Sequence, residues 1–227
     1  MTTFFLVRHG ATAHTGQKLS GWLPDVHLTD EGRAQAEAAA DYLARLPLKA
    51  VYSSPIDRTM ETARPIADRH GLRVQTRRTL GEVEFGRWTD RSFKTLRRTK
   101  LWGVVQRFPS GARFPDGESL LEVQQRAVRE VELLRMAHPR DSICCVSHAD
   151  TIRLVVAHYL GVHIDLFQRI EVGAASITVI AVGDQGPRIL AVNFSPIRLT
   201  SEEGLGPPGD SRTRRVLRRG GTPSGSR

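Results

Sequence analysis

A short apolar run near the start of the chain ends in an arginine and a histidine. Residues 4–7 are all apolar and are followed directly by Arg8, His9 and Gly10. An apolar run of this length is typical of a buried β-strand. In an open α/β sheet the ligand crevice lies just beyond the carboxyl ends of such strands. The Arg8–His9 pair is therefore either the polar end of a strand or part of an anion site, and the run alone leaves both open.

Strands and helices alternate along most of the chain. Thr29 precedes a helix that has acids in its first turn, and Ser53-Ser54-Pro55 indicates a capping serine with proline at the first helical position. Ser119 is expected to cap a long helix. A further helix is expected at 150–160, whereas residues 80–115 favour irregular structure with short helical pieces. Strands are expected around residues 4–8, 49–52, 73–76, 142–147, 176–182 and 188–192. Such alternation predicts a three-layer α/β/α fold with a mostly parallel central sheet.

Composition divides the chain into a folded domain at 1–196 and a tail at 197–227. The tail is rich in Gly, Pro, Ser and Arg, so it is expected to be disordered. No apolar stretch reaches the roughly 20 residues of a membrane span. No basic segment followed by an apolar one opens the sequence, so we expect no secretory signal. Cys144 and Cys145 are neighbours whose side chains point to opposite faces of a strand, so we expect them to stay reduced. This favours a cytoplasmic location.

The net charge of +9 raises the question of nucleic-acid binding. Residues 200–227 hold six arginines against three acids, so they supply +3 and the rest of the chain +6. The sequence contains no zinc-ligand set and no RNA-binding aromatic strand. We therefore expect a solvated basic surface that attracts small anions. Nucleic-acid contact is expected at most as weak contact by the tail.

Basic and imidazole side chains stand at three strand ends. Arg8 and His9 end the first strand, Arg58 lies in the first turn of the helix after the second, and His148 follows the strand at 142–147. Parallel strands end at the same edge of a sheet, so these residues can meet in one pocket. Taken singly, Arg58 is equally a solvated helix arginine, and His148 a hydrogen-bonded histidine at a strand end.

Together these residues suit phosphoryl transfer. The transferred group spreads negative charge over three oxygens, and forked arginines bind such oxygens well. An imidazole can attack the phosphorus and form a phosphohistidine. The leaving alkoxide then needs a proton from a nearby carboxylic acid. Glu82 and Glu84 are both candidates, and the pattern alone does not separate them.

Five blocks of sequence resemble the histidine phosphatase superfamily, the phosphoglycerate mutase-like group. They occur in family order and cover roughly residues 3–195. The blocks are Leu6–Thr12 with Leu28–Gly32 and Gln35-Ala36, Ser53–Thr59 with Glu61–Ala63, Leu80–Glu82 with Phe85–Trp88, Gly117–Ser119, and Ser147–Ala149.

The resemblance assigns roles to individual positions. It implies that His9 is the phosphorylated nucleophile and that Glu82 is the proton donor, with Glu84 peripheral. It places Arg8, Arg58 and His148 in the phosphate pocket, and it adds Ser20, Gly21 and Ala149 as substrate-binding residues.

Two positions depart from the family pattern. Ala11 stands where many members have Glu, and Thr15 stands where many have a phosphate-binding Asn. The hydroxyl of Thr15 either replaces the Asn contact or leaves it unmade.

The resemblance leaves a choice between hydrolysis and mutase chemistry. The cofactor-dependent mutases carry a longer, more basic insertion after the proton-donor block, whereas residues 82–118 are compact here. We therefore favour a metal-independent phosphatase that acts on a small phosphorylated metabolite and needs no cofactor. The alternative is a mutase that uses 2,3-bisphosphoglycerate, because an anionic substrate can still contact Arg97, Arg98 and Lys100. A non-catalytic phospho-ligand or RNA-binding module is a third hypothesis, which an intact proton donor argues against.

Metal binding and assembly have little support in the sequence. The remaining histidines lie scattered, so no metal site is expected, and no pattern indicates an oligomeric state. They are His14, His27, His70, His138, His158 and His163.

Overall fold

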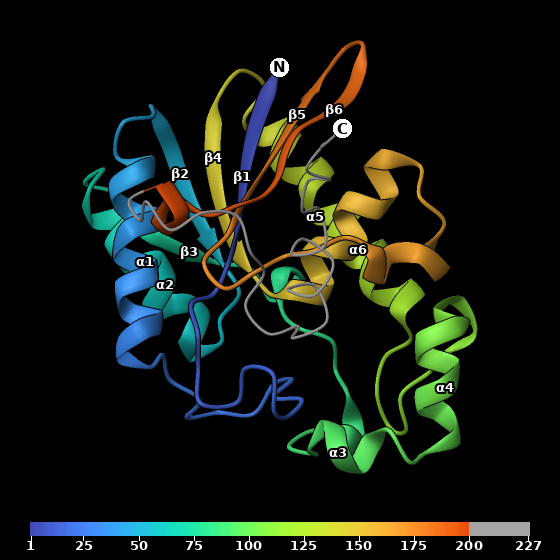
Figure 1. The fold of residues 1–227 in the computed structure, drawn as a ribbon. Coiled ribbons are helices and arrows are strands. Elements are labelled where there is room, and N and C mark those ends of the chain that lie inside the picture. Colours follow the sequence, from blue (N-terminus) through green and yellow to red (C-terminus); the bar gives the residue numbers. More distant parts are fainter. Residues whose placement is uncertain (200–227) are drawn as a thin grey trace, which may run out of the picture. The chain divides into compact units, whose positions relative to one another are not determined.

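A computed structural model describes residues 1–199 of the chain (Figure 1). Residues 1–197 form one compact unit. The strands are β1 (Thr2–Arg8), β2 (Leu48–Ser53), β3 (Val74–Thr76), β4 (Ser142–Ser147), β5 (Ile177–Gly183) and β6 (Gly186–Phe194). The helices are α1 (Asp30–Leu43), α2 (Asp57–Asp68), α3 (Phe93–Leu96), α4 (Lys100–Arg107), α5 (Leu120–Ala137) and α6 (Ala149–Leu160). Five 3-10 helices complete the set: η1 (Arg78–Leu80), η2 (Gly86–Trp88), η3 (Pro109–Gly111), η4 (Ile164–Arg169) and η5 (Pro196–Leu199).

The six strands form a single mixed sheet in the order β3-β2-β4-β1-β5-β6. The first four in this order run parallel to one another, whereas β5 is antiparallel to β1 and β6 to β5. The predicted fold class, with its mostly parallel sheet, is confirmed. The antiparallel β5 brings its first residues to the carboxyl end of β1, where Ser176 accepts a hydrogen bond from the Arg8 amide.

Helices cover both faces of the sheet. Helices α1 and α2 lie on one side of it and α5 and α6 on the other (Figure 1). Alternate residues of each strand point to opposite faces, so Phe5 and Val7 pack among the residues of α1 and α2, and Phe4 and Leu6 among those of α5 and α6. Full burial of such a side chain contributes about 1.5–3 kcal/mol. This packing fixes β1, and with it the position of its polar end.

Cys144 and Cys145 follow the same rule. Both are buried and unpaired, and they belong to the cores on opposite faces of the sheet. Among residues 1–199, no helix is long and apolar enough to cross a membrane.

The segment between η1 and α5 packs around its own apolar cluster. Phe85, Trp88 and Phe114 are buried there, and the ring centroid of Phe114 lies 4.9 Å from that of Phe85 and 5.4 Å from that of Trp88. The short helices α3 and α4 of this segment lie beyond the edge of the sheet at which β1 ends (Figure 1). This segment therefore stands beside the strand ends, on the side where the predicted site lies.

One predicted helix start is wrong. Helix α2 begins at Asp57, two residues later than Ser54-Pro55 would place it, and its N-cap Ile56 makes no side-chain cap hydrogen bond. The hydroxyl of Ser54 contacts a different group, because it lies 2.9 Å from Nε2 of His148. By contrast, Ser119 caps α5 as predicted, in a full capping box with Glu122. The predicted tail lies, apart from its first three residues, outside the described residues.

Candidate active site

His9 is the first residue after β1 and is almost fully buried. Its Nδ1 lies 2.7 Å from the carbonyl oxygen of Gly10, and a carbonyl can only accept, so Nδ1 carries the proton. The lone pair is then on Nε2, which faces Nε of Arg58 at 3.3 Å. Burial, together with the charges of Arg58 and Arg8, holds the pKa of His9 well below its usual range. His9 is thus a neutral imidazole whose unprotonated nitrogen is turned toward an arginine.

Gly10 allows the chain to leave β1 at this point. A Cβ built on Gly10 would lie 2.3 Å from the carbonyl oxygen of Gly32, and one on Gly32 would lie 2.0 Å from that of Ala11. Both contacts are with backbone, so side chains there would force the segments apart. The Gly10 amide donates to Oγ1 of Thr62 on α2, which ties the turn to the helix that carries Arg58.

Arg58 is buried in the first turn of α2, with 1% of its surface exposed. Its Nη2 donates to the carbonyl oxygen of Gly21 at 2.8 Å and lies 3.3 Å from Nδ1 of His148. Its Nη1 is buried without an acceptor among the described residues. Burial lowers the pKa of Arg58, with the charge of Glu82 opposing the shift. The guanidinium therefore stands between both imidazoles with one donor group free.

Arg8, at the end of β1, has a similar free donor. Its Nη1 donates to the carbonyl oxygen of Val172 at 2.8 Å, while Nε is buried without an acceptor within residues 1–199. A buried donor left unpaired costs about 1–3 kcal/mol. Two such donors, on guanidiniums that flank one imidazole, make a pocket whose unmet hydrogen bonds suit the oxygens of an anion.

His148 is the first residue after β4 and is fully buried as the N-cap of α6. Its ring centroid lies 5.3 Å from that of His9, and its Nε2 lies 2.9 Å from Oγ of Ser54. Burial and the charge of Arg58 hold its pKa well below the ordinary histidine value. A neutral His148 is therefore fixed beside His9, with each ring nitrogen facing a polar partner.

Glu82 completes the group. One of its carboxylate oxygens lies 4.0 Å from Nδ1 of His148, and 12% of the side chain is exposed. Burial first, and then the charge of Asp150, raise the pKa of Glu82 to about 7. Glu84 has different surroundings, because its carboxylate pairs with Arg78 at 2.7 Å and its side chain is 44% exposed. Of the two candidate acids, Glu82 is the one that lies in the pocket with a protonated form accessible near neutral pH.

A family model describes nearly the whole described part of the chain. Residues 4–195 match the model of the histidine phosphatase superfamily (branch 1). The chain belongs to this superfamily. The expected family is thereby confirmed, and the chain is an enzyme of the histidine phosphatase type, as its sequence predicts.

Relatives of this histidine phosphatase include proteins named as phosphatases and as mutases. It is 28% identical to phosphoserine phosphatase 1 of Hydrogenobacter thermophilus over 205 residues, which cover 86% of this chain and 93% of that protein. It is 28% identical to a probable phosphoglycerate mutase, GpmB, of Yersinia enterocolitica, over 71% of this chain and 76% of that one. The solved structure of phosphoserine phosphatase from Entamoeba histolytica in complex with 3-phosphoglyceric acid matches with a TM-score of 0.77, 25% identity and coverage of 86% and 98%.

Arg126 of α5 supports the Glu82 segment of this histidine phosphatase, and no sequence pattern indicated it. Its guanidinium donates to the carbonyl oxygens of Thr79, Gly81 and Glu82 at 2.8–3.0 Å and pairs with Glu118 at 2.7 Å. Such a contact depends on how α5 packs, so only the intact fold reveals it. The Gly117–Ser119 block of the sequence is where Glu118 stands.

The other predicted binding residues differ in how close they come to the pocket. Gly21 contacts Arg58 through its carbonyl, and Ala149 begins α6 next to His148. The half-buried Ser20 pairs with Nδ1 of His14 at 3.1 Å. Thr15 is exposed, and its hydroxyl accepts a hydrogen bond from the amide of Thr12 at 2.9 Å. The amide of Ala11, at the other atypical position, donates to the side chain of Gln35.

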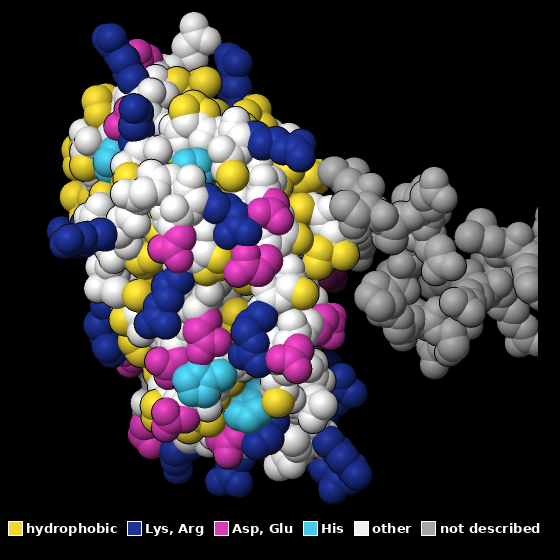
Figure 2. All heavy atoms as spheres, turned by 90° about the vertical axis from the view of Figure 1, so that its left-hand side faces the viewer, with side chains coloured by type: hydrophobic (Ala, Val, Ile, Leu, Met, Phe, Trp, Pro, Cys, Tyr) yellow, Lys and Arg dark blue, Asp and Glu magenta, His cyan; other side chains and the backbone are white. Residues whose placement is uncertain are grey.

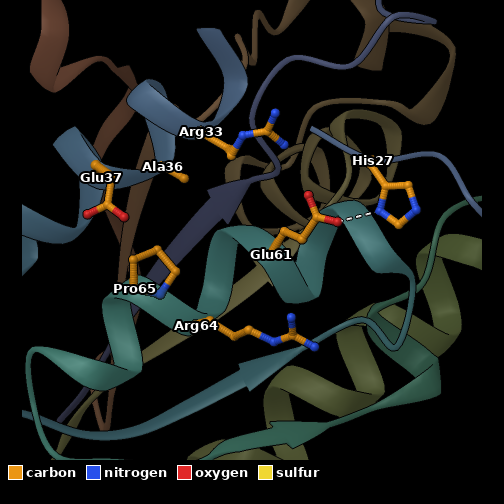
Figure 3. Close-up of a pocket in the computed structure, with 7 residues that line it drawn as sticks. All are labelled: His27, Arg33, Ala36, Glu37, Glu61, Arg64 and Pro65. Atoms are coloured by element: carbon orange, nitrogen blue, oxygen red, sulfur yellow. Dashed lines mark hydrogen bonds and ion pairs between the residues drawn. The ribbon is translucent and has the colours of Figure 1, made fainter. Parts of the chain in front are cut away.

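A second hollow lies away from these residues, between α1 and α2. Its volume is about 390 Å³, and it is lined by His27, Arg33, Ala36, Glu37, Glu61, Arg64 and Pro65 (Figure 3). His27 Nδ1 pairs there with Oε1 of Glu61 at 2.5 Å, and the other oxygen of Glu61 accepts from the Leu28 amide. Glu61 thus fastens the β1–α1 connection to α2. Within residues 1–199, no group of three or more histidine, cysteine or acidic side chains is arranged to hold a metal ion.

Charges of both signs are mixed on the surface. Figure 2 shows one face, on which lysine and arginine side chains lie among aspartate and glutamate side chains. Several are joined in pairs, as where Arg69 contacts both Glu37 and Asp41. On the face seen in Figure 2, the positive charge is therefore dispersed.

Proposed function

We propose that this histidine phosphatase hydrolyses small phosphomonoesters through a covalent phosphohistidine at His9. One observation carries the proposal. The buried donors Arg8 Nε and Arg58 Nη1 have no acceptor in the described part of the chain, and they belong to the two arginines that flank the His9 imidazole. A phosphoryl group bound by both arginines would meet those donors and lie in reach of the imidazole nitrogen.

The proposed first step transfers the phosphoryl group to the protein. Nε2 of His9 forms a bond to phosphorus while the ester P–O bond breaks. The leaving alkoxide takes the proton of Glu82, whose pKa of about 7 allows a protonated fraction at neutral pH. Arg8, Arg58 and His148 stabilise the charge on the transferred oxygens.

The second step returns the enzyme to its starting state. The Glu82 carboxylate takes a proton from water as the water oxygen bonds to phosphorus and the P–N bond breaks. Inorganic phosphate leaves, and His9 is again neutral. Arg8 and Arg58 supply the positive charge, and Glu82 gives and takes the proton in the two steps, so we infer metal-independent catalysis without a cofactor.

We infer further that Ser20, Gly21 and Ala149 contact the substrate beside the phosphate, because they adjoin Arg58 and His148 in the fold. The hydroxyl of Thr15 already accepts a hydrogen bond from the Thr12 amide, so we infer that Thr15 contributes least to phosphate binding. Two buried unpaired cysteines are consistent with a reducing, cytoplasmic location. The similarity to phosphoserine phosphatase 1 places phosphoserine first among substrates to test.

Hydrolysis and mutase activity can be separated directly. We expect phosphate release from a panel of alkyl phosphates that includes phosphoserine, and little isomerisation of 3-phosphoglycerate in the presence of 2,3-bisphosphoglycerate. Fast isomerisation with negligible hydrolysis would establish the mutase alternative. The similarity to a probable phosphoglycerate mutase is the reason to test it. Binding of phosphate esters without either reaction would favour the non-catalytic module.

The nucleophile is tested by substitution. His9→Ala should abolish turnover and should also abolish acid-labile labelling of the protein by radiolabelled substrate. Labelling that persists in this variant would show that another residue is phosphorylated. His14→Ala is the matched control, because His14 lies in the β1–α1 connection and should leave the labelling intact.

A further inference from the structure

Trp22 lies between the proposed acid and a proposed phosphate-binding arginine. It is a half-buried residue of the β1–α1 connection, and its indole Nε1 donates to the carbonyl oxygen of Glu82 at 2.7 Å. The carbonyl oxygen of the preceding residue, Gly21, accepts a hydrogen bond from Nη2 of Arg58 at 2.8 Å. Two consecutive residues of the connection therefore contact the main chain of Glu82 and the guanidinium of Arg58.

The indole ring is held against the chain that leads to Glu82. Cζ of Arg78 lies over the ring of Trp22, 4.2 Å from its centroid. A Cβ built on Gly81 would lie 2.1 Å from Cζ2 of the same ring, so the ring packs directly against the backbone at Gly81. These contacts fix the direction in which the indole N–H points.

The Glu82 segment has other supports, which come from other elements. Arg126 of α5 donates to the carbonyl oxygens of Gly81 and Glu82 at 3.0 and 2.9 Å, and Thr151 of α6 donates to that of Gly81 at 2.8 Å. These contacts join the segment to two helices on one face of the sheet. Trp22 instead joins it to the β1–α1 connection, and so to the proposed phosphate-binding group.

The distance between phosphate and acid governs the proposed first step. The proton of Glu82 must reach the ester oxygen as that oxygen leaves phosphorus, which requires the two oxygens to lie about 2.6–3.2 Å apart. A misplacement of about 1 Å can cost on the order of 10²-fold in rate. Arg58 holds the phosphate and Glu82 supplies the proton, so a link between their supports sets this distance.

We propose that Trp22 is a positioning residue for the reaction, one whose indole N–H holds the main chain of Glu82 in place relative to the phosphate bound by Arg58. This inference rests on the proposed function of Glu82 as the acid. Trp22 donates to the main chain and exchanges no proton with the substrate. Its loss should therefore slow the cleavage of esters that need an acid and spare those that do not.

The test compares two leaving groups in the full-length Trp22→Phe variant. Phenylalanine keeps an aromatic ring beside Arg78 and lacks the N–H. The quotient kcat/KM covers the steps up to departure of the alcohol, so it reports the transfer to His9. With the alkyl phosphate that the wild type cleaves fastest, kcat/KM should fall by about tenfold, because a displacement smaller than 1 Å costs less than 10²-fold. With p-nitrophenyl phosphate, whose leaving group needs no proton, it should stay close to that of the wild type.

Three further measurements make the test specific. The inhibition constant of inorganic phosphate should be unchanged in Trp22→Phe, because the phosphate pocket keeps both arginines. In a Glu82→Gln background, Trp22→Phe should cause no further loss with the alkyl phosphate. Trp102→Phe is the matched control, because Trp102 stacks on Trp88 with ring centroids 6.3 Å apart. It should leave the ratio between the two substrates unchanged.

A second replacement removes the donor and keeps the shape of the side chain. Replacing Trp22 by 3-benzothienylalanine puts sulfur in the place of the indole N–H. This protein should show the same selective loss with the alkyl phosphate, and it provides the test if Trp22→Phe does not fold.

The outcomes separate this inference from the proposed function. An active wild type whose preference between the two substrates is unchanged by both replacements would overturn the inference alone. Equal losses with both substrates, or weaker inhibition by phosphate, would overturn it as well, because they indicate a structural effect on the whole pocket. A wild type that cleaves none of the esters would contradict the proposed function, and this inference with it.

Discussion

Two histidine–glutamate neighbourhoods of this protein have opposite electrostatics. In the pocket, His148 is fully buried and lies 4.0 Å from Glu82, whose side chain is 12% exposed. Between α1 and α2, His27 and Glu61 are 56% and 23% exposed and in direct contact (Figure 3). Burial lowers the pKa of His148 and raises that of Glu82, whereas the hydrogen bond that His27 donates to Glu61 raises the pKa of His27. Burial thus favours the neutral forms of His148 and Glu82, whereas the exposed contact favours the charged form of His27.

The difference follows from the solvent rather than from the residue types. Water stabilises both charges of an exposed pair, so the attraction between them decides the outcome. In the pocket that hydration is lost, and Arg8 and Arg58 further disfavour a charged imidazole. A neutral nucleophile and a protonated acid are what the proposed phosphoryl transfer to His9 requires, and the buried pocket favours both forms, whereas the exposed pair fastens a loop.

The largest difference between the two glutamates is expected in catalysis. Glu82→Gln should lower kcat for an alkyl phosphate by about 10²–10⁴-fold, because the leaving alkoxide then lacks its proton donor. Glu61→Gln should change kcat far less, since the Glu61 carboxylate hydrogen-bonds with His27 and the Leu28 amide rather than with a residue of the pocket. Steady-state kinetics on both variants make the comparison. Similar losses in both would mean that Glu82 acts through structure alone.

The leaving group provides an internal control for this prediction. p-Nitrophenolate leaves without a proton, so the loss in Glu82→Gln should be much smaller with p-nitrophenyl phosphate. Glu84→Gln is the matched variant, because Glu84 lies two residues away and pairs with Arg78 on the surface. Its activity on both substrates should stay close to that of the wild type.

Much of the fold and part of the site could be predicted because local patterns encode them. Apolar runs that end at Arg8 and before His148 identify buried parallel strands, and parallel strands bring their ends to one edge. Glu82 and Glu84 are alike in sequence, and the residues alone did not separate them. Their environments differ only once α2, α5 and α6 are packed, so the resemblance to a family was needed to choose Glu82.

Contacts that depend on packing could not be predicted. Ser54 fits a helix cap in sequence, but in the fold its hydroxyl reaches a histidine 94 positions away. Arg126 reaches carbonyls of η1 from α5, and the Val172 carbonyl binds Arg8 across 164 positions. Main-chain acceptors leave no trace in side-chain patterns. The apolar run at 176–182 predicts a strand, but it does not show that β5 pairs antiparallel with β1.

An intermediate effect, on stability, is expected when the hydrogen-bond partner of His148 is removed. Ser54→Ala removes the hydroxyl that His148 Nε2 contacts in the interior and should destabilise the fold by about 1–3 kcal/mol. His27 has no such dependence, because it is exposed to water. Thermal unfolding should show the Tm of Ser54→Ala lower by about 2–4 °C for each kcal/mol lost, and kcat should fall as His148 loses its fixed orientation.

Ser176→Ala is the matched control for this effect. Ser176 is also buried near Arg8, but its hydroxyl has no hydrogen-bond partner among the described residues. Its loss should be nearly neutral or slightly stabilising. Equal destabilisation by both variants would show that the cavity, and not the contact with His148, determines the cost.

The smallest effect is expected from the exposed pair, and it should depend on pH. Glu61 raises the pKa of His27 in the folded protein above its usual 6.5, so the protonated form stabilises the fold. That stabilisation is complete below pH 6.5 and is lost as pH rises through the raised pKa. The Tm advantage of the wild type over His27→Gln should therefore be largest near pH 5.5 and shrink above neutrality. In a Glu61→Gln background the same comparison should be flat. If the Tm difference between the wild type and His27→Gln stayed constant across pH, the pair would be held by its hydrogen bond and not by its charge.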